Sequence, residues 1–357
     1  MSEHNLSQLL QDVITHQASD LHLISRSKPL IRIDGKLESV NAPELTGKEI
    51  EEMCFPFISD KQKKHFEEYS ELDFSFELKD IGRFRVNYYH ALGEMCAAFR
   101  PIPITIPSLD DLGSPTIYKK LIKREKGIIL VTGPTGSGKS TTLAAMLNEI
   151  NEYEQKHIVT AEDPVEFVHT NKKSVFSHRE VGNDTASFAN ALKYAMRQDP
   201  DVILVGEMRD KETIAAALTA AETGHLVFAT LHTNSAPSTI NRIIDVFPGE
   251  EQPQVRAMLS ASLVAVISQS LIPKIKGGRI ATSEIMVMNH AIANLIREEK
   301  VHQIYSQMQL GQEDSGMQTQ TQVLVSLVKQ GIISKENAIQ FSNRPDELLK
   351  LMPGGLY

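Results

Sequence analysis

The stretch Gly127-Ile-Ile-Leu-Val-Thr-Gly-Pro-Thr-Gly-Ser-Gly-Lys-Ser140 decides the fold of this 357-residue chain. It opens with an apolar run that predicts a buried strand, and residues 133–140 match the pattern GxxxxGK[ST] in full. A helical pattern follows at once, over residues 139–152. Glycines let backbone N–H groups curl around phosphate oxygens, and the start of a helix adds partial positive charge. The stretch therefore predicts a phosphate-binding loop between a strand and a helix.

This loop supplies the candidate nucleotide-binding residues. Lys139 would reach the β- and γ-phosphates of ATP, and the Ser140 hydroxyl would bind Mg²⁺. We therefore expect ATP and Mg²⁺ to bind here. The residues that we assign to the nucleotide are Gly133, Pro134, Thr135, Gly136, Ser137, Gly138, Lys139, Ser140 and Thr141.

The pattern around the loop predicts an α/β fold. Apolar strands alternate with helical patterns, which is typical of a parallel sheet covered by helices. The strands are expected at 127–132, 157–160, 202–205 and 226–230, and the helices at 139–152, 184–197, 210–222 and 235–244. From about residue 286 onward we predict mainly helices, at 289–299, 300–309, 317–330 and 334–342, and a frayed tail at 352–357.

The first 110 residues differ from the rest in charge and in pattern. They hold 12 Lys and Arg against 18 Asp and Glu, a net charge of −6, whereas the remaining 25 against 27 give −2. Alternating apolar residues indicate a separate α+β domain with a half-buried antiparallel sheet. We predict helices at 6–17 and 46–69, the second opened by a capping box of Thr46 and Glu49, a hairpin at 30–40, and strands at 72–78, 83–89 and 94–99.

A proline-rich stretch, Pro101-Ile-Pro-Ile-Thr-Ile-Pro107, separates the two patterns. Each proline lacks a backbone donor and biases its predecessor to extended geometry, so the stretch is typical of a stiff linker. We therefore predict an N-terminal domain at 1–106, a linker at 107–118, a P-loop core at 119–285 and a helical C-terminal region at 286–357.

Acidic residues follow two of the predicted strands, at the edge where a parallel sheet places its ligand-binding residues. We interpret Glu207 as the residue that polarises the attacking water, and Glu162 and Asp163 as contacts to Mg²⁺ or to the γ-phosphate side. The alternatives are that Glu207 is a solvated loop acid paired with Arg209, and that Glu162 and Asp163 only cap a helix.

Histidines and arginines complete the candidate site. His232 follows a predicted strand, where an imidazole can donate to a γ-phosphate oxygen, and His225 starts the same strand. The alternative for both is a histidine bonded to the backbone. Arg83 and Arg85 share one face of a strand, which is either a solvated face or the source of an arginine for a neighbouring subunit's nucleotide. Further candidates are Arg197, Arg209, Arg256 and Arg279.

Composition excludes several classes of protein. Two cysteines, Cys54 and Cys96, cannot form a disulfide framework or a four-thiolate zinc site, and we expect buried thiols in a reducing compartment. The N-terminus lacks a basic region followed by an apolar core, and no run of about 18 apolar residues occurs, so we expect neither a secretory signal nor a transmembrane helix. The net charge of −8 argues against a nucleic-acid partner.

Six motifs together resemble the type II/IV secretion ATPase superfamily, and within it the branch that retracts type IV pili. They occur in the family's order across about residues 5–345, which is far more specific than the phosphate-binding loop alone. The motifs are Ala18–Leu23, Arg83–Asn87, Gly133–Thr142, Ala161–Phe167, Leu204–Asp210 and Thr223–Thr233.

The resemblance implies a PAS-like N-terminal domain, a RecA-like ATPase core and a homohexameric ring with ATP sites between domains and neighbouring subunits. It also implies a cytoplasmic protein that acts on a platform protein at the inner membrane. The residues that it assigns are Glu162 and Asp163 in an acidic box, Glu207 as the catalytic glutamate, His225 and His232 in a histidine box, and Arg83 as an arginine brought from the N-terminal domain.

Residues 291–298, Ala-Ile-Ala-Asn-Leu-Ile-Arg-Glu, match the helix that is diagnostic of retraction motors, although the alternative is an ordinary amphipathic helix. The commonest form has Arg where this chain has Ala293, so no role of that arginine is carried over. Assembly and type II secretion relatives usually carry a four-cysteine zinc element, which this chain lacks. The alternatives that we keep are an accessory retraction paralogue, an assembly or secretion ATPase, a RecA-like nucleic-acid translocase and a P-loop switch that hardly hydrolyses ATP.

Overall fold

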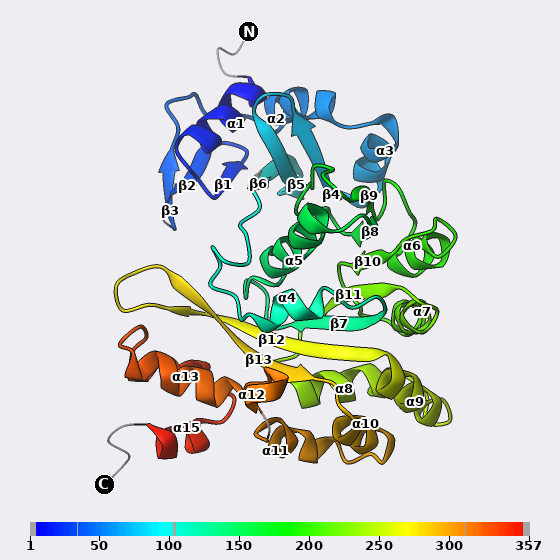
Figure 1. Ribbon diagram of the computed structural model, residues 1–357. Coiled ribbons are helices and arrows are strands. Elements are labelled where there is room, and N and C mark those ends of the chain that lie inside the picture. The colour runs from blue at the N-terminus through cyan, green and yellow to red at the C-terminus, as the bar shows by residue number, and fades with distance from the viewer. Residues whose placement is uncertain (1–4, 34, 103–104, 311, 353–357) are drawn as a thin grey trace. The chain divides into compact units, whose positions relative to one another are not determined.

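The computed structural model describes residues 5–33, 35–102, 105–310 and 312–352, which form two compact units (Figure 1). One unit comprises the residues up to Thr105 together with Pro164–Val168. The other comprises residues 106–163 and those from His169 onward. Each unit has its own sheet and its own buried apolar core, which fits the mixed α/β fold class that the sequence predicts.

The first unit is built on a six-stranded antiparallel sheet in the order β3-β2-β1-β6-β5-β4. The strands are β1 (Asp20–Leu23), β2 (Leu30–Ile33), β3 (Lys36–Ser39), β4 (Glu71–Leu78), β5 (Gly82–Ala91) and β6 (Glu94–Ile102). Its helices are α1 (Leu6–Thr15), α2 (Gly47–Cys54), the short η1 (Phe55–Phe57) and α3 (Asp60–Tyr69). Apolar residues of the helices and of one sheet face form a single core.

Local sequence explains the elements of this unit. Thr46 and Glu49 form the predicted capping box at the start of α2. The predicted helix 46–69 is interrupted, however, because Pro56 removes a backbone donor and a second capping box restarts the chain as α3. On β5, Phe84 is fully buried while Arg85 is exposed, so the predicted period-two alternation is confirmed.

The second unit contains a seven-stranded sheet in the order β13-β12-β7-β11-β10-β8-β9, which is parallel except for β13. Its strands are β7 (Gly127–Thr132), β8 (His157–Glu162), β9 (Val175–Glu180), β10 (Val202–Val205), β11 (Leu226–Leu231), β12 (Leu263–Pro273) and β13 (Arg279–Val287). The four predicted parallel strands are confirmed. Strands β9, β12 and β13 were not predicted.

Helices cover both faces of this sheet. Ile129 and Val131 of β7 belong to one core with α4 (Ile117–Leu121) and α5 (Lys139–Tyr153). Ile128 and Leu130 belong to the opposite core, which includes residues of α6 (Phe188–Ala195), α7 (Lys211–Glu222), α8 (Ala236–Asp245), α9 (Gln252–Ser262) and α10 (His290–Arg297). Successive residues of a strand point to opposite faces, so an unbroken apolar run is what a sheet covered on both faces requires.

The chain after β13 is helical, as the sequence predicts. Its remaining elements are η2 (Val301–Gln303), α11 (Ile304–Met308), α12 (Gln312–Ser315), α13 (Gln320–Lys329), α14 (Lys335–Phe341) and α15 (Pro345–Leu351). Apolar residues of α13, α14 and α15 pack with Ile272 of β12 in a small separate cluster. Among the described residues, no helix is long and apolar enough to cross a membrane.

The C-terminal tail and the proline-rich linker are described only in part. The expected frayed tail lies outside the described residues from position 353 on, and so do residues 103–104 of the proline-rich stretch. Pro101 and Ile102 are not linker, because they end β6 opposite Phe84 and Arg83. Within 107–118, Leu109 and Tyr118 are buried in the core of the second unit.

Candidate functional site

Strands β7, β8, β10 and β11 end together at one edge of the second sheet. Thr132 of β7 lies beside Leu231 of β11, and Val205 of β10 lies between Ala161 of β8 and Ala229 of β11. The parallel register therefore places the phosphate-binding loop, Glu162, Glu207 and His232 just past the ends of neighbouring strands.

The phosphate-binding loop has backbone geometry that its glycines permit. Gly133, Gly136 and Gly138 have φ angles of +140°, +79° and +87°, in the region that disfavours residues with a Cβ. Lys139 Nζ donates to the carbonyl oxygens of Gly133 at 2.9 Å and Pro134 at 3.1 Å. The ammonium group thus lies over the loop itself, where a bound phosphate would meet it.

Features of the loop fit a phosphate group. The side chain of Ser137 is buried, and its Oγ has no hydrogen-bond partner among the described residues. A Cβ at Gly136 would meet no heavy atom within 4 Å, so the outer side of the loop is open. An open loop that starts a helix and carries a lysine provides the N–H donors and positive charge that phosphate oxygens need.

Glu207 is held from two sides at the same edge. Its Oε1 lies 2.5 Å from Arg209 Nε and 3.0 Å from His232 Nε2. The Glu207 side chain is 18% exposed, whereas that of Arg209 is 76% exposed. The hydrogen bond to Glu207 raises the pKa of Arg209, and the charge of Asp163 contributes. The pairing of Glu207 with Arg209, which the alternative of a solvated loop acid requires, is present. Glu207 also contacts His232, however, and an isolated surface acid would lack this second contact.

Glu162 ends β8 in a buried position beside β10. It is 9% exposed, and the backbones approach so closely that a Cβ at Gly206 would lie 3.3 Å from Glu162 Cα. His178 Nδ1 of β9 lies 4.0 Å from Glu162 Oε1 and 3.1 Å from Thr160 Oγ1. Asp163, the next residue, is exposed. The acidic pair therefore presents one buried and one solvated carboxylate at the sheet edge.

His178 belongs to a stack of three rings that sequence reasoning missed. The rings of His169 and Phe176 stack at 4.3 Å, and those of Phe176 and His178 at 5.3 Å. The backbone N–H of His169 donates to His178 Nε2 at 3.2 Å, so the proton of a neutral His178 sits on Nδ1, facing Thr160. Burial lowers the pKa of His169 to about 3. The only sequence signal was the histidine in Val175–Glu180, an edge strand too polar to be predicted.

Two predicted residues of the second unit, His225 and Arg279, do not join this cluster. His225 precedes β11 at the opposite edge, about 20 Å along six residues of strand, and its Nδ1 lies 2.9 Å from the carbonyl of Ala220. Arg279 is exposed and opens β13 opposite Pro273, beyond the part of β12 that pairs with β7. Arg83 lies in the first unit, where its Nη2 donates to Ser75 Oγ at 2.6 Å. Their assignment to the nucleotide stays a prediction.

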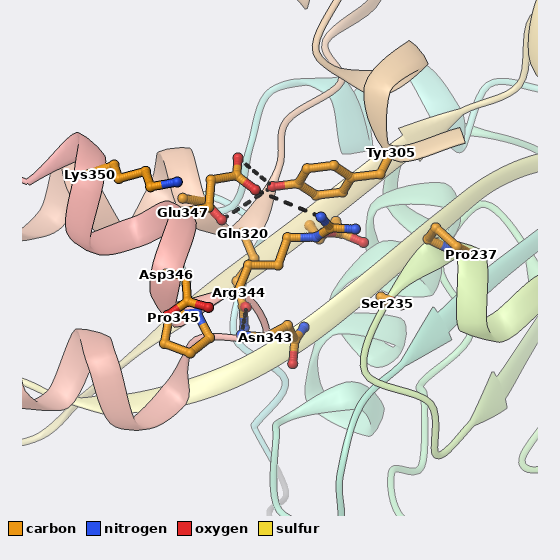
Figure 2. A pocket seen from close by; sticks show the side chains of 12 residues that line it. Ser235, Pro237, Tyr305, Gln320, Asn343, Arg344, Pro345, Asp346, Glu347 and Lys350 are labelled. Carbon is orange, nitrogen blue, oxygen red and sulfur yellow. Dashed lines mark hydrogen bonds and ion pairs between the residues drawn. The ribbon is translucent and has the colours of Figure 1, made fainter. Parts of the chain in front are cut away.

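A separate cavity of about 670 Å³ lies among the C-terminal helices, and none of the predicted site residues lines it (Figure 2). Arg344 stacks on the ring of Tyr305 at 3.6 Å, and the Tyr305 hydroxyl donates to Glu347 Oε1 at 3.0 Å. Asn343 Nδ2 donates at 2.7 Å to the carbonyl oxygen of Asn234, which is the second residue after His232. The cavity therefore adjoins the segment that leaves the candidate site, and one of its cations, Arg344, pairs with Glu347 Oε2 at 3.9 Å.

Comparisons with known proteins agree with this geometry. Residues 1–340 match the family of type II/IV secretion system proteins. The chain is 52% identical to the type IV pilus retraction ATPase PilT of Pseudomonas aeruginosa, over 96% of this chain and 99% of that protein. It is 55% identical to a twitching motility protein of Neisseria gonorrhoeae, over 87% of this chain and 83% of that protein.

A solved structure supports the same assignment. A crystal structure of the pilus retraction motor PilT with bound ADP superposes with a TM-score of 0.92 at 48% identity, and the match covers 98% of this chain and 100% of that chain. The predicted resemblance and fold class are therefore confirmed. The chain belongs to the type II/IV secretion system protein family and is one of its ATPases.

Proposed function

We propose that this protein is the motor that hydrolyses ATP to retract a type IV pilus, and so drives twitching motility. The observation that carries the proposal is Glu207 held by Arg209 and His232 at the edge that bears the phosphate-binding loop. It occurs in a chain that matches a retraction ATPase over nearly its whole length.

Each residue at the sheet edge has a role in this proposal. The loop glycines and Lys139 bind the phosphates, and Glu207 orients and polarises the attacking water. Phosphoryl transfer needs little covalent chemistry from the protein, so positioning and charge are the main contributions. His232 contacts Glu207 at 3.0 Å, which lets it respond to the loss of the γ-phosphate and pass that change to the segment leading to Asn234.

Mg²⁺ is part of the proposal. Ser140, in the first turn of α5, and Asp163 would hold it, and Glu162 is the residue before Asp163. The described residues contain no group of three or more His, Cys, Asp or Glu side chains that could hold a metal ion by themselves. That fits Mg²⁺ bound with a nucleotide, since this ion usually takes several ligands from water and phosphate oxygens. When bound, it would neutralise charge on the β- and γ-phosphates.

The working assembly that we propose is a homohexameric ring at the cytoplasmic face of the inner membrane. Arg83 would reach the nucleotide of a neighbouring subunit, and Arg279 and His225 would contact nucleotide only in the ring. The chain around Thr105 and Ile106, where the first unit ends and the second begins, would act as the hinge between domains, because Leu109 and Tyr118 of the predicted linker 107–118 are buried in the second unit. Rotation of one domain against the other would move an inner-membrane platform protein, so that pilin subunits leave the filament.

Residues 291–298 favour retraction over assembly. In α10, Ile292 and Ile296 are fully buried, while Ala291 and Asn294 are exposed. Ala293 is 7% exposed, so the residue that replaces the usual arginine lies on the packed side of the helix. The helix thus keeps its apolar face and presents an exposed polar face to a partner.

A biochemical experiment separates this proposal from its rivals. The purified full chain is assayed for ATP hydrolysis with and without Mg²⁺, and with and without single- or double-stranded DNA. We expect Mg²⁺-dependent turnover that DNA leaves unchanged. Stimulation by DNA would instead indicate a nucleic-acid translocase, and a folded ring without measurable turnover would indicate a P-loop switch.

A further inference from the structure

Strand β12 brings the buried side chain of Gln269 to the phosphate-binding loop. β12 runs parallel to β7, and Ser268 lies beside Thr132 with their hydroxyl oxygens 2.8 Å apart. The next residue on β12 is Gln269, which therefore lies beside Gly133, the first residue of the loop. Gln269 is 4% exposed, and nothing in the sequence around it marks it as functional.

The Gln269 amide bridges the loop and the helix that follows it. Its Nε2 donates to the carbonyl oxygen of Ser137 at 2.8 Å. Its Oε1 accepts from Thr142 Oγ1, in the first turn of α5, at 2.9 Å. Both ends of the amide are thus used, and this fixes its orientation.

The backbone carbonyl and the side-chain amide of Gln269 also explain one glycine of the motif each. A Cβ at Gly133 would lie 2.2 Å from the Gln269 carbonyl oxygen, and a Cβ at Gly138 would lie 2.9 Å from Gln269 Nε2. Both distances are shorter than real Cβ contacts allow. Loop and strand are therefore packed so closely around Gln269 that a side chain at Gly133 or Gly138 would have to displace it.

We infer that Gln269 is a positioning residue that holds the loop in its phosphate-binding shape. In a trans peptide the N–H points opposite to the C=O. Because Gln269 holds the Ser137 carbonyl toward β12, the N–H of Gly138 points away from β12 and is kept as a donor for phosphate. Gln269 acts through Ser137 and Thr142 and does not itself touch the nucleotide. This inference rests on ATP binding by the loop.

Two variants of Gln269 test the inference in the purified full-length protein. Gln269→Glu keeps the size but cannot donate to the Ser137 carbonyl, and Gln269→Leu removes both hydrogen bonds. We expect each variant to raise KM and Kd for ATP about tenfold, the effect of losing well-formed hydrogen bonds that preorganise a site. The kcat of the nucleotide-saturated variants should change much less, since Glu207 and His232 are untouched.

Gln320 provides a matched control. It is also buried, and its amide also bridges two partners, donating to the carbonyl of Phe341 at 3.1 Å and accepting from the N–H of Asn343 at 2.9 Å. Gln320→Leu should lower the melting temperature as Gln269→Leu does but leave KM unchanged. If both glutamine variants lower the melting temperature and both keep the wild-type KM, Gln269 is merely structural and the inference is wrong.

A second variant covers the case in which Gln269 substitutions do not fold. Thr142→Val removes one of the two hydrogen bonds and should raise KM less than Gln269→Leu would. An unchanged KM in a folded Thr142→Val protein would contradict the inference. If the wild-type protein binds no ATP, the proposed function itself is wrong. If the wild-type protein binds ATP and the variants bind it equally well, only the inference on Gln269 is wrong.

Discussion

Glu207 is the residue on which the proposed chemistry depends most. Its carboxylate oxygen contacts both Arg209 and His232, and its side chain is mostly buried. In Glu207→Gln the amide keeps the shape but loses the charge that polarises water. We expect nucleotide binding to stay within a few-fold of wild type and turnover to fall by about 10²-fold or more. Turnover near the wild-type rate, measured as phosphate release, would remove Glu207 from the catalytic role.

His169 makes stability depend on pH. Burial lowers its pKa to about 3, from an ordinary value of 6.5. Below about pH 6.5 this histidine is protonated in the unfolded chain but stays neutral in the folded chain. The free energy of unfolding therefore decreases by about 1.4 kcal/mol for each unit by which the pH is lowered, until the pKa of the folded state is reached. His178 and Lys172 add to the lowering.

Replacing His169 should remove this dependence. In His169→Phe the ring can still stack on Phe176 and the backbone N–H still reaches His178. We expect the free energy of unfolding of the variant minus that of wild type to be about 2 kcal/mol larger at about pH 5 than at about pH 7.5. The exposed His302 is the control, and His302→Phe should show no such change. Parallel pH curves for His169→Phe and wild type would contradict the argument.

Some site residues can be predicted from sequence and others cannot. The loop, Glu207 and His232 follow apolar strands directly, so a local pattern locates them and the parallel register brings them together. Gln269 reaches the loop only because β12 lies next to β7, more than a hundred residues later in the chain. His178 likewise depends on the pairing of β9 with β8. No local pattern contains this information.

Two glycines of the phosphate-binding loop differ in how much space a side chain would have. At Gly133 a Cβ would clash with the Gln269 carbonyl oxygen at 2.2 Å, whereas at Gly136 it would meet nothing within 4 Å. Gly133→Ala should therefore destabilise the protein by about 3 kcal/mol or more and abolish ATP binding. Gly136→Ala should cost only about 1 kcal/mol of backbone strain. Denaturant unfolding without nucleotide checks the order, and equal losses would contradict it.

At the scale of elements, strength of pattern decides what can be predicted. Strands β7, β8, β10 and β11 are largely apolar and buried on both faces, and all four were predicted. Strand β12 is also largely buried, but its middle is the polar run Ser268–Ser270, and it follows α9 directly, with Ser262 ending the helix and Leu263 starting the strand. No Gly or Pro separates them, so the sequence gives no sign that the period changes from helix to strand.

At the scale of the whole molecule, Arg83 tests the proposed ring. If it acts on a neighbour's nucleotide, a complete site needs Glu207 from one subunit and Arg83 from the next. Arg83→Ala and Glu207→Gln proteins should each be inactive alone. Rings assembled from a mixture of the two should regain part of the wild-type ATPase rate, because some interfaces then combine an intact Glu207 with an intact Arg83. Mixed rings that stay inactive would mean that Arg83 does not act between subunits.

The measurement that tests the central claim most directly is made in the cell of origin. The gene is deleted and complemented with wild type or Glu207→Gln, and surface pili and twitching motility are scored together. The proposal expects many pili without motility in the deletion and in the Glu207→Gln strain, with both traits restored by wild type. Cells without pili would contradict it, because they would show that the motor assembles pili rather than retracts them.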